Sequence, residues 1–300
     1  MPPENPRRGM PRLYKGKIPI MLQTERHFFA PGRVNLIGDH TDYNGGLVFP
    51  AALNMGTYLT VKQHDDADSC RFISENDSAE FLIRKEELSQ KRNSWVDYPL
   101  GVIKEFTDRG FPVSGLQFHY SGDLPIGAAL SSSASIEMVT AVALNALNDS
   151  PFTMLELVQM AQHAENDFVG MNCGIMDQFA SGFGKKNCAI ALDCNTLAYE
   201  HVPLEMHGLK FVIANTNKKR GLVDSAYTSG AASASRRWRS SVRTGRSIVS
   251  ANSRWISLIR LRHILRATYS SAPDMRCART RTCARPSPRS RPATWSASDS

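Results

Sequence analysis

The segment that most constrains this chain is PIGAALSSSAS, residues 125–135, which connects two apolar stretches. Residues 116–120 before it have the pattern of a strand, and residues 136–147 after it have the spacing of an apolar helix. Small residues let the backbone approach an anion, converging N–H groups can bind it, and the helix dipole adds positive charge. The segment therefore predicts a phosphate-binding loop, with an ordinary serine-rich helix start as the alternative. It is not a Walker A loop, because no Gly-Lys-Ser/Thr triplet is present.

A second segment, RVNLIGDHTDYNGG (33–46), places a cluster of polar side chains after an apolar stretch. Carboxylate, imidazole and hydroxyl groups on one loop can hydrogen-bond to a polyhydroxylated ligand. Composition alone favours a simpler interpretation, a polar surface turn closed by Gly45 and Gly46.

A third segment, ENDFVGMNCGIMDQ (165–178), contains carboxylates in apolar surroundings. Glu165 ends an apolar helical stretch, and Asp177 lies among apolar or small residues. A carboxylate in such a place is costly to desolvate without a partner, which makes both residues candidate functional groups. Helix capping is the alternative for each of them.

The remaining apolar patterns predict a compact α/β protein from about Phe28 onward. HFFAPGRVNLIG (27–38) is predicted to form a strand, a Pro-Gly turn and a second strand. Helices are expected at residues 94–106 and 154–168, and further buried or half-buried strands at residues 47–49, 56–61, 188–192 and 211–214.

Composition excludes two classes of protein. No run of about 18 apolar residues is present, so no membrane span is predicted. The cysteines form no CxxC pair, which favours free thiols in a reducing cytosol over a zinc site.

The net charge of the chain changes sign near residue 227. Residues 1–227 hold 21 Lys and Arg against 26 Asp and Glu, a net charge of −5. Residues 228–300 hold 15 Arg, no Lys and only two acids, Asp274 and Asp299, a net charge of +13. Because helical and strand periods are also absent from this tail, no separate fold is predicted for it.

The segments APGRVNLIGDHTDYNGG, PIGAALSSSAS and GMNCGIMDQ, in this order, resemble the galactokinases of the GHMP kinase family. GLVDSAY (221–227) resembles the stretch that holds the family's sugar-contacting tyrosine, so the resemblance covers about residues 28–227. It implies an α+β GHMP kinase fold whose N-terminal domain, of the ribosomal S5 domain 2-like type, is largely present, with the C-terminal domain mostly missing. It also implies transfer of the ATP γ-phosphate to the C1 hydroxyl of galactose, with Mg²⁺ as cofactor.

Carried onto this chain, the resemblance makes Asp177 the acceptor of the C1 hydroxyl proton. Arg33 would lie beside it and stabilise the charge of the transferring phosphoryl group. Ser133 and Glu165 would hold Mg²⁺. The nucleotide would contact Ser74, Gly127, Ala128, Ala129, Leu130, Ser131, Ser132 and Ser133. The sugar would face Asp39, His40, Thr41, Asp42 and Tyr227. Phosphoryl transfer requires little covalent chemistry from the protein, so positioning and charge stabilisation would carry the rate.

Two positions depart from the family pattern. The nucleotide loop usually reads PxGxGLSSS, but Ala129 replaces its second glycine. If that position requires a positive φ, the added Cβ costs about 1 kcal/mol. Asp39 stands where the family often has Glu, so its contact with the sugar must shift or pass through water.

We interpret residues 228–300 as the product of a one-base deletion. Galactokinases typically continue after this tyrosine with Asn-Glu-Arg-Arg, whereas Tyr227 is followed by TSGAASA, and removing one base from suitable codons converts the first into the second. Codons for PATWSASDS (292–300), read in the earlier frame, can give GDLVGFGQ, which resembles the family's GDLxxFG segment. The chain then divides into an extension (1–27), the N-terminal kinase domain (28–207), the start of the second domain (208–227) and the tail (228–300). Such a chain is expected to be poorly soluble and either impaired or inactive as a kinase.

Other interpretations stay open on the sequence alone. The same domain could serve as a galactose sensor without catalysis, although the presence of both Asp177 and Arg33 disfavours this. N-acetylgalactosamine could be the substrate. The basic tail could contact nucleic acid, but it contains no known binding module. We expect a cytoplasmic monomer with galactose and ATP as partners and with neither a nucleic-acid nor a membrane partner.

Overall fold

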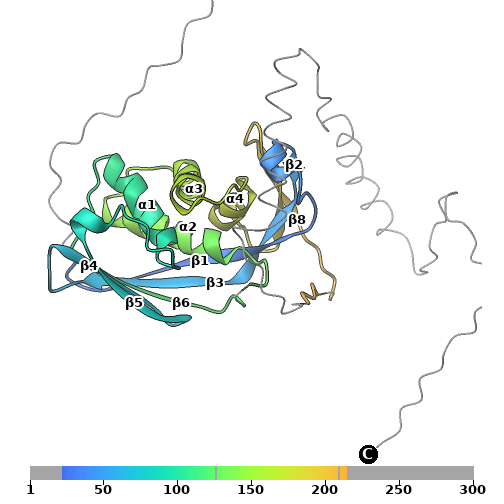
Figure 1. Ribbon diagram of the computed structural model, residues 1–300. Coiled ribbons are helices and arrows are strands. Elements are labelled where there is room, and N and C mark those ends of the chain that lie inside the picture. Colours follow the sequence, from blue (N-terminus) through green and yellow to red (C-terminus); the bar gives the residue numbers. More distant parts are fainter. Residues whose placement is uncertain (1–21, 126, 209, 215–300) are drawn as a thin grey trace, which may run out of the picture. The chain divides into compact units, whose positions relative to one another are not determined.

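The structure, a computed structural model, describes residues 22–125, 127–208 and 210–214 (Figure 1). Its strands are β1 (Arg26–Asn35), β2 (Leu47–Val48), β3 (Pro50–Gln63), β4 (Ser69–Ser74), β5 (Asp77–Arg84), β6 (Leu116–Gly122), β7 (Cys188–Asp193) and β8 (Tyr199–Pro203). The α-helices are α1 (Asp97–Asp108), α2 (Ser132–Leu147), α3 (Met154–His163) and α4 (Met176–Phe183). Short 3₁₀ turns occupy Asp42–Asn44 and Lys85–Glu87, and a π-helical turn occupies Ala164–Val169. The predicted α+β class is confirmed.

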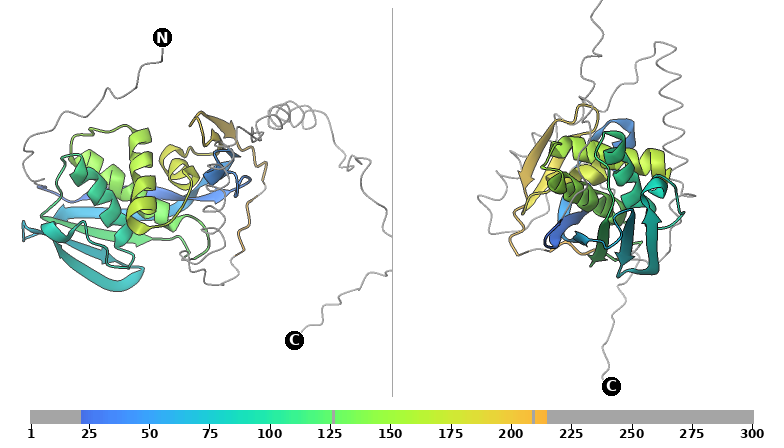
Figure 2. Two further views of the ribbon diagram at one scale, coloured as in Figure 1. Left: turned by 45° about the horizontal axis from the view of Figure 1, so that its top comes forward. Right: turned by 90° about the vertical axis from the view of Figure 1, so that its left-hand side faces the viewer.

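A five-stranded sheet, in the order β1-β3-β6-β4-β5, carries the four helices on one face (Figures 1 and 2). Its strand pairs are antiparallel except β4 with β6, which are parallel. The core lies between this sheet and the helices, where Leu59, Phe72 and Phe118 of the sheet are buried with Phe106 and Met138 of the helices. A smaller sheet, β2-β7-β8, lies at the end of the molecule where β1 and β3 reach furthest.

Residues 27–38 form one long strand with a bulge, not two strands joined by a turn. Strand β1 pairs with β3 on both sides of Gly32, and the register shifts between Pro31 and Arg33. A Cβ on Gly32 would lie 2.6 Å from the carbonyl oxygen of Leu130. The absence of a side chain on Gly32 therefore lets the backbone of residues 127–131 pack directly on the bulge. The bulge also changes the direction in which the following side chains of β1 point, as bulges often do near functional sites.

Two further predictions need correction. The helix expected at 154–168 consists of α3 followed by the π-helical turn, a feature that occurs mostly at functional sites. The buried strand expected at 211–214 is absent from these described residues, and Phe211, Val212 and Ile213 are exposed. Apolar residues form a buried strand only when a neighbouring strand and a core receive them, and the described part of the chain supplies neither.

Candidate active site

The centre of the site is a bidentate ion pair between two residues 144 positions apart. Arg33 Nε donates to Asp177 Oδ1 at 2.7 Å, and Arg33 Nη2 donates to Asp177 Oδ2 at 2.8 Å. Arg33 comes from β1 just after the bulge, and Asp177 lies in the first turn of α4. Both side chains are largely buried, so the planar guanidinium fixes the orientation of the carboxylate.

The loop that precedes α2 has the backbone geometry of an anion-binding nest. Gly127, Ala129 and Ser131 have positive φ angles of 74°, 58° and 58°, whereas Ala128 and Leu130 between them do not. Alternation of this kind points successive N–H groups into one concavity. The carbonyl oxygens of Ala129 and Leu130 accept from Arg33, from Nη1 and the backbone N respectively, so they face β1 and not that concavity.

The backbone of Ala129 is strained in this loop, because a residue with a Cβ is unfavourable at a φ of 58°. We expect Ala129→Gly to raise the free energy of unfolding by about 1 kcal/mol, measured by urea denaturation. Ala128→Gly is the matched control, since Ala128 has no positive φ and its replacement should not stabilise. Equal effects of the two substitutions would contradict the assignment of strain to Ala129.

Ser131 does not act as the ordinary helix cap that its sequence suggests. It occupies the N-cap position of α2 but makes no side-chain capping bond. Its hydroxyl instead donates to Asp177 Oδ2 at 2.6 Å. The loop, the start of α2 and the carboxylate of α4 are therefore joined at a single point.

Ser133 and Glu165 are the predicted metal ligands, and the Ser133 hydroxyl is near enough to Glu165 to lower the pKa of its carboxyl group. Burial first, and the charge of Asp177 second, raise the pKa of Glu165 to about 7. No group of three or more His, Cys, Asp or Glu side chains suitable for a metal occurs in the part of the chain that the structure describes. One carboxylate with one hydroxyl still fits Mg²⁺, which commonly binds one or two carboxylates together with substrate phosphates and water.

The predicted sugar residues follow β1 in a loop that faces α4. Asp42 is buried, accepts from the backbone N of Met176 at 3.1 Å, and has its pKa raised to about 6, mainly by burial. A Cβ on Gly174 would overlap the Asp42 carboxyl group, at 2.1 Å from Cγ, so this approach requires glycine. Asp39 accepts from Asn35 Nδ2, and His40 Nδ1 bonds to the Tyr43 hydroxyl.

Three predicted residues are less directly connected to this site. The Thr41 hydroxyl lies within hydrogen-bond distance of the carbonyl oxygens of Gly38 and Leu47, can donate to either, and so holds the loop itself together. Ser74 ends β4 and accepts from Asn76 N, and the hydrogen bonds of the described residues do not link it to the 127–133 loop. Tyr227 lies outside the described residues.

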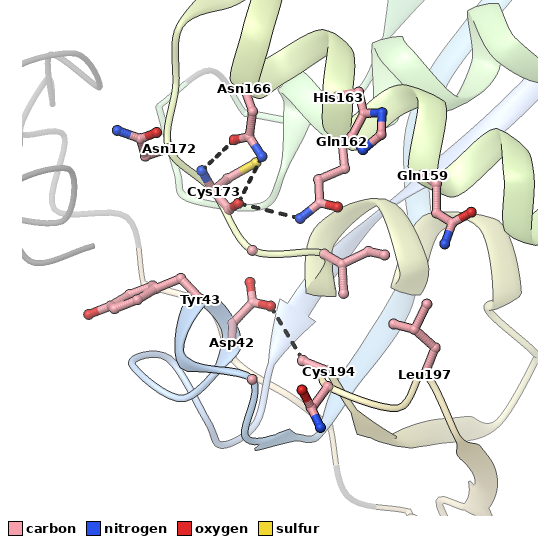
Figure 3. Close-up of a pocket in the computed structure, with 14 residues that line it drawn as sticks. Asp42, Tyr43, Gln159, Gln162, His163, Asn166, Asn172, Cys173, Cys194 and Leu197 are labelled. Carbon is pink, nitrogen blue, oxygen red and sulfur yellow. Dashed lines mark hydrogen bonds between the residues drawn. The ribbon is translucent and has the colours of Figure 1, made fainter. Parts of the chain in front are cut away.

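A polar cavity of about 620 Å³ opens behind Asp42 (Figure 3). Its lining includes Asp42 and Tyr43, together with His163, two cysteines and the amide side chains of Gln159, Gln162, Asn166, Asn172 and Asn195. Arg33 and Asp177 do not line it. We place the chemistry at the ion pair because the 127–131 loop and the Asp177 carboxylate meet there.

The sequence analysis missed two residues of this region, Gln178 and Glu137. Gln178 Nε2 donates both to Glu165 Oε2 at 2.6 Å and to Glu137 Oε2 at 3.0 Å, and all three side chains are buried. A signal was present, because Glu137 is a charged residue inside an otherwise apolar helical segment.

Two family descriptions match the chain. Residues 22–63 match the galactokinase galactose-binding signature, and residues 97–185 match the N-terminal domain of GHMP kinases. A galactokinase from Clostridium beijerinckii is 52% identical over 208 residues, which cover 68% of this chain and 53% of that protein. A galactokinase from Bacillus subtilis is 55% identical over 207 residues, which cover 67% of this chain and 53% of that protein. The chain thus spans about half the length of the curated relatives it matches.

Solved structures agree with these matches. The galactokinase of Lactococcus lactis, complexed with galactose, superposes with a TM-score of 0.68 at 38% identity, covering 76% of this chain and 59% of that one. The mevalonate kinase of Methanococcus jannaschii shares the fold, with a TM-score of 0.52 at 18% identity over 60% of this chain and 56% of that one. The chain therefore contains the N-terminal domain of the GHMP kinases and is homologous to galactokinases over two thirds of its length.

Proposed function

We propose that this site transfers the γ-phosphate of ATP to the C1 hydroxyl of galactose. The observation that carries the proposal is the convergence of the Asp177–Arg33 pair with the 127–131 nest through Ser131. Homology to galactokinases and the matched galactose-binding signature support galactose as the sugar.

Asp177 acts as the base through one of its two carboxylate oxygens, Oδ1. Among the described residues, Oδ2 accepts from both Arg33 and Ser131, whereas Oδ1 accepts from Arg33 alone. A carboxylate oxygen has two acceptor positions, so Oδ1 retains one for the sugar hydroxyl. The C1 oxygen attacks the γ-phosphorus, its proton passes to Asp177, and the bond to the oxygen of ADP breaks.

The remaining residues position the reactants and stabilise charge. The amides of residues 127–133 and the start of α2 bind the phosphates, and Arg33 stabilises negative charge that develops during transfer. Asp39, His40 and Asp42 hold the sugar hydroxyls. Ser133 and Glu165 would hold Mg²⁺, which neutralises phosphate charge and orients the transferring group.

We also propose that the chain is divided into domains at the positions predicted from the sequence. Residues 28–207 are the N-terminal kinase domain, 208–227 begin the second domain, and the tail from 228 does not continue the kinase. In support, alignments with the curated relatives extend over only about two thirds of this chain.

We further propose a cytoplasmic location, which the free thiols of Cys70, Cys173, Cys188 and Cys194 fit. No helix among the described residues is long and apolar enough to cross a membrane.

The proposal is tested by following radiolabelled phosphate from ATP to sugar with the 300-residue chain in excess over ATP, so that slow transfer is detected. We expect transfer to galactose and none to 1-deoxygalactose, which lacks the accepting hydroxyl. Binding of galactose without any transfer would favour a sensor, and preferential labelling of N-acetylgalactosamine would change the assigned substrate.

Galactose affinity should fall as the pH is lowered through about 6. The pKa of Asp42 is raised to about 6 by burial, so its carboxylate gains a proton below that pH and loses an acceptor for sugar hydroxyls. Calorimetric titration between pH 5 and 8, values that bracket this pKa by about one to two units, measures the change. Asp42→Asn should bind weakly with no such dependence, and an equal pH slope in both proteins would contradict the role of Asp42.

A further inference from the structure

Glu137, Gln178 and Glu165 form a buried chain of polar side chains beneath the active site. Glu137 and Gln178 have no exposed surface, and Glu165 is 4% exposed. Gln178 Nε2 uses its two hydrogens to join the carboxylates, with bonds of 2.6 Å to Glu165 and 3.0 Å to Glu137. Helices α2 and α4 and the π-helical turn, which carry these residues, are thereby connected inside the core.

The two ends of this chain differ in their surroundings. Glu165 accepts from the thiol of Cys173 at 3.4 Å, and the nearby Ser133 hydroxyl lowers the pKa of its carboxyl group. Glu137 lies deeper, and burial first, then the charge of Glu165, raise its pKa well above the ordinary value. Glu137 Oε1 and Gln178 Oε1 have no hydrogen-bond partner among the described residues. Both atoms are acceptors when Glu137 is ionised, so neither of them then receives a donor.

We propose that Gln178 is a positioning residue for the metal of the nucleotide, holding Glu165 in place with the Glu137 side chain as its anchor. This inference rests on the proposed function, since it assigns Glu165 to the metal. Partners behind a metal ligand fix its orientation, and a buried carboxylate without such a partner would rotate or remain protonated.

The same arrangement links the metal ligand to the base. Gln178 follows Asp177 directly in the first turn of α4. Asp177 is held by Arg33 and Ser131, and Gln178 is held by Glu137, so the first turn of α4 positions both the base and the partner of the predicted metal ligand Glu165. Gln178 contributes position alone, because its bonds go to protein side chains and not to the reacting atoms.

The test measures Mn²⁺ binding to the 300-residue chain by electron paramagnetic resonance, with a non-hydrolysable ATP analogue present. Gln178→Met keeps the volume of the side chain but removes both N–H donors. We expect it to weaken Mn²⁺ binding by about 10–100-fold, while affinity for the analogue without metal changes little. Asn145→Leu is the matched control, because Asn145 is a buried amide that bonds only to the backbone of Phe152. It should lower stability without weakening Mn²⁺ binding.

A second pair of variants keeps the proposal testable if Gln178→Met does not fold. Glu137→Gln retains an acceptor for Gln178 and should bind Mn²⁺ about 10-fold more tightly than Glu137→Leu, which removes the anchor. Equal Mn²⁺ affinity in Gln178→Met and the unchanged chain, or in the two Glu137 variants, would overturn the positioning role and leave the proposed kinase intact. If the unchanged chain binds no Mn²⁺ with the analogue, the proposed function itself fails, and this inference fails with it.

Discussion

Replacing Asp177 with Asn is expected to slow phosphate transfer from ATP to galactose by about 10²–10⁴-fold, the usual contribution of a positioned general base. The amide cannot accept the C1 proton, and its NH₂ group faces a donor of Arg33 in place of an acceptor. Single-turnover transfer of labelled phosphate measures the ratio of rates even where the absolute rate is low.

Asp97→Asn provides the matched control for this loss. Asp97 is also buried, but its carboxylate accepts from the backbone N–H groups of Arg92 and Asn93, away from the ion pair. Asp97→Asn should lower the stability of the fold, because it weakens two buried hydrogen bonds. It should leave the transfer rate within about threefold, because Asp97 makes no contact with the ion pair. A rate for Asp177→Asn that matches the control would remove Asp177 from the chemistry.

Replacing Arg33 with Met is expected to lower both the rate and the stability. The guanidinium makes two bonds to Asp177 and one to the carbonyl of Ala129, so its loss separates the loop from α4. The side chains of the pair are 13% and 24% exposed, so we expect a loss of about 3 kcal/mol, the lower end for a broken buried pair. Transfer should slow by a further factor of about 10²–10³, because charge on the phosphoryl group is no longer stabilised.

The stability loss has a specific electrostatic cause that a second variant can isolate. The charge of Asp177 already raises the pKa values of Asp42 and Glu165, so removing its partner leaves several acids close together. Arg33→Lys keeps the positive charge but not the planar fork, and should recover part of the stability and little of the rate. Chemical denaturation and single-turnover transfer together distinguish the two effects, and full recovery of the rate by Lys would contradict the bidentate geometry.

Much of this site follows from local sequence signals. The Gly/Ser loop, the strand before it and the helix after it are placed correctly because small residues and apolar periodicity act over short distances. Strain at Ala129 was expected on the condition that its φ is positive, and the φ of 58° meets that condition. The meeting of Arg33 and Asp177 followed from resemblance and not from pattern, because 144 residues separate them.

Other features depend on contacts that no local pattern contains. The Pro-Gly pair predicted a turn, but the register of β1 with β3 on both sides accommodates Gly32 as a bulge. Ser131 was expected to cap a helix or bind phosphate, whereas its hydroxyl reaches Asp177 on another helix. No sequence pattern indicated a role for Gln178, because its two buried carboxylate partners come from distant segments of the chain.

The central claim concerns where the reactants bind, so the most direct measurement is a crystal structure of the chain with galactose and a non-hydrolysable ATP analogue. We predict the C1 oxygen within about 2.6–3.2 Å of Asp177 Oδ1, and the terminal phosphates against the amides of residues 127–133. Galactose bound instead in the cavity lined by Gln162 and Asn172, or phosphates bound away from the loop, would contradict the assignment of this site to phosphoryl transfer.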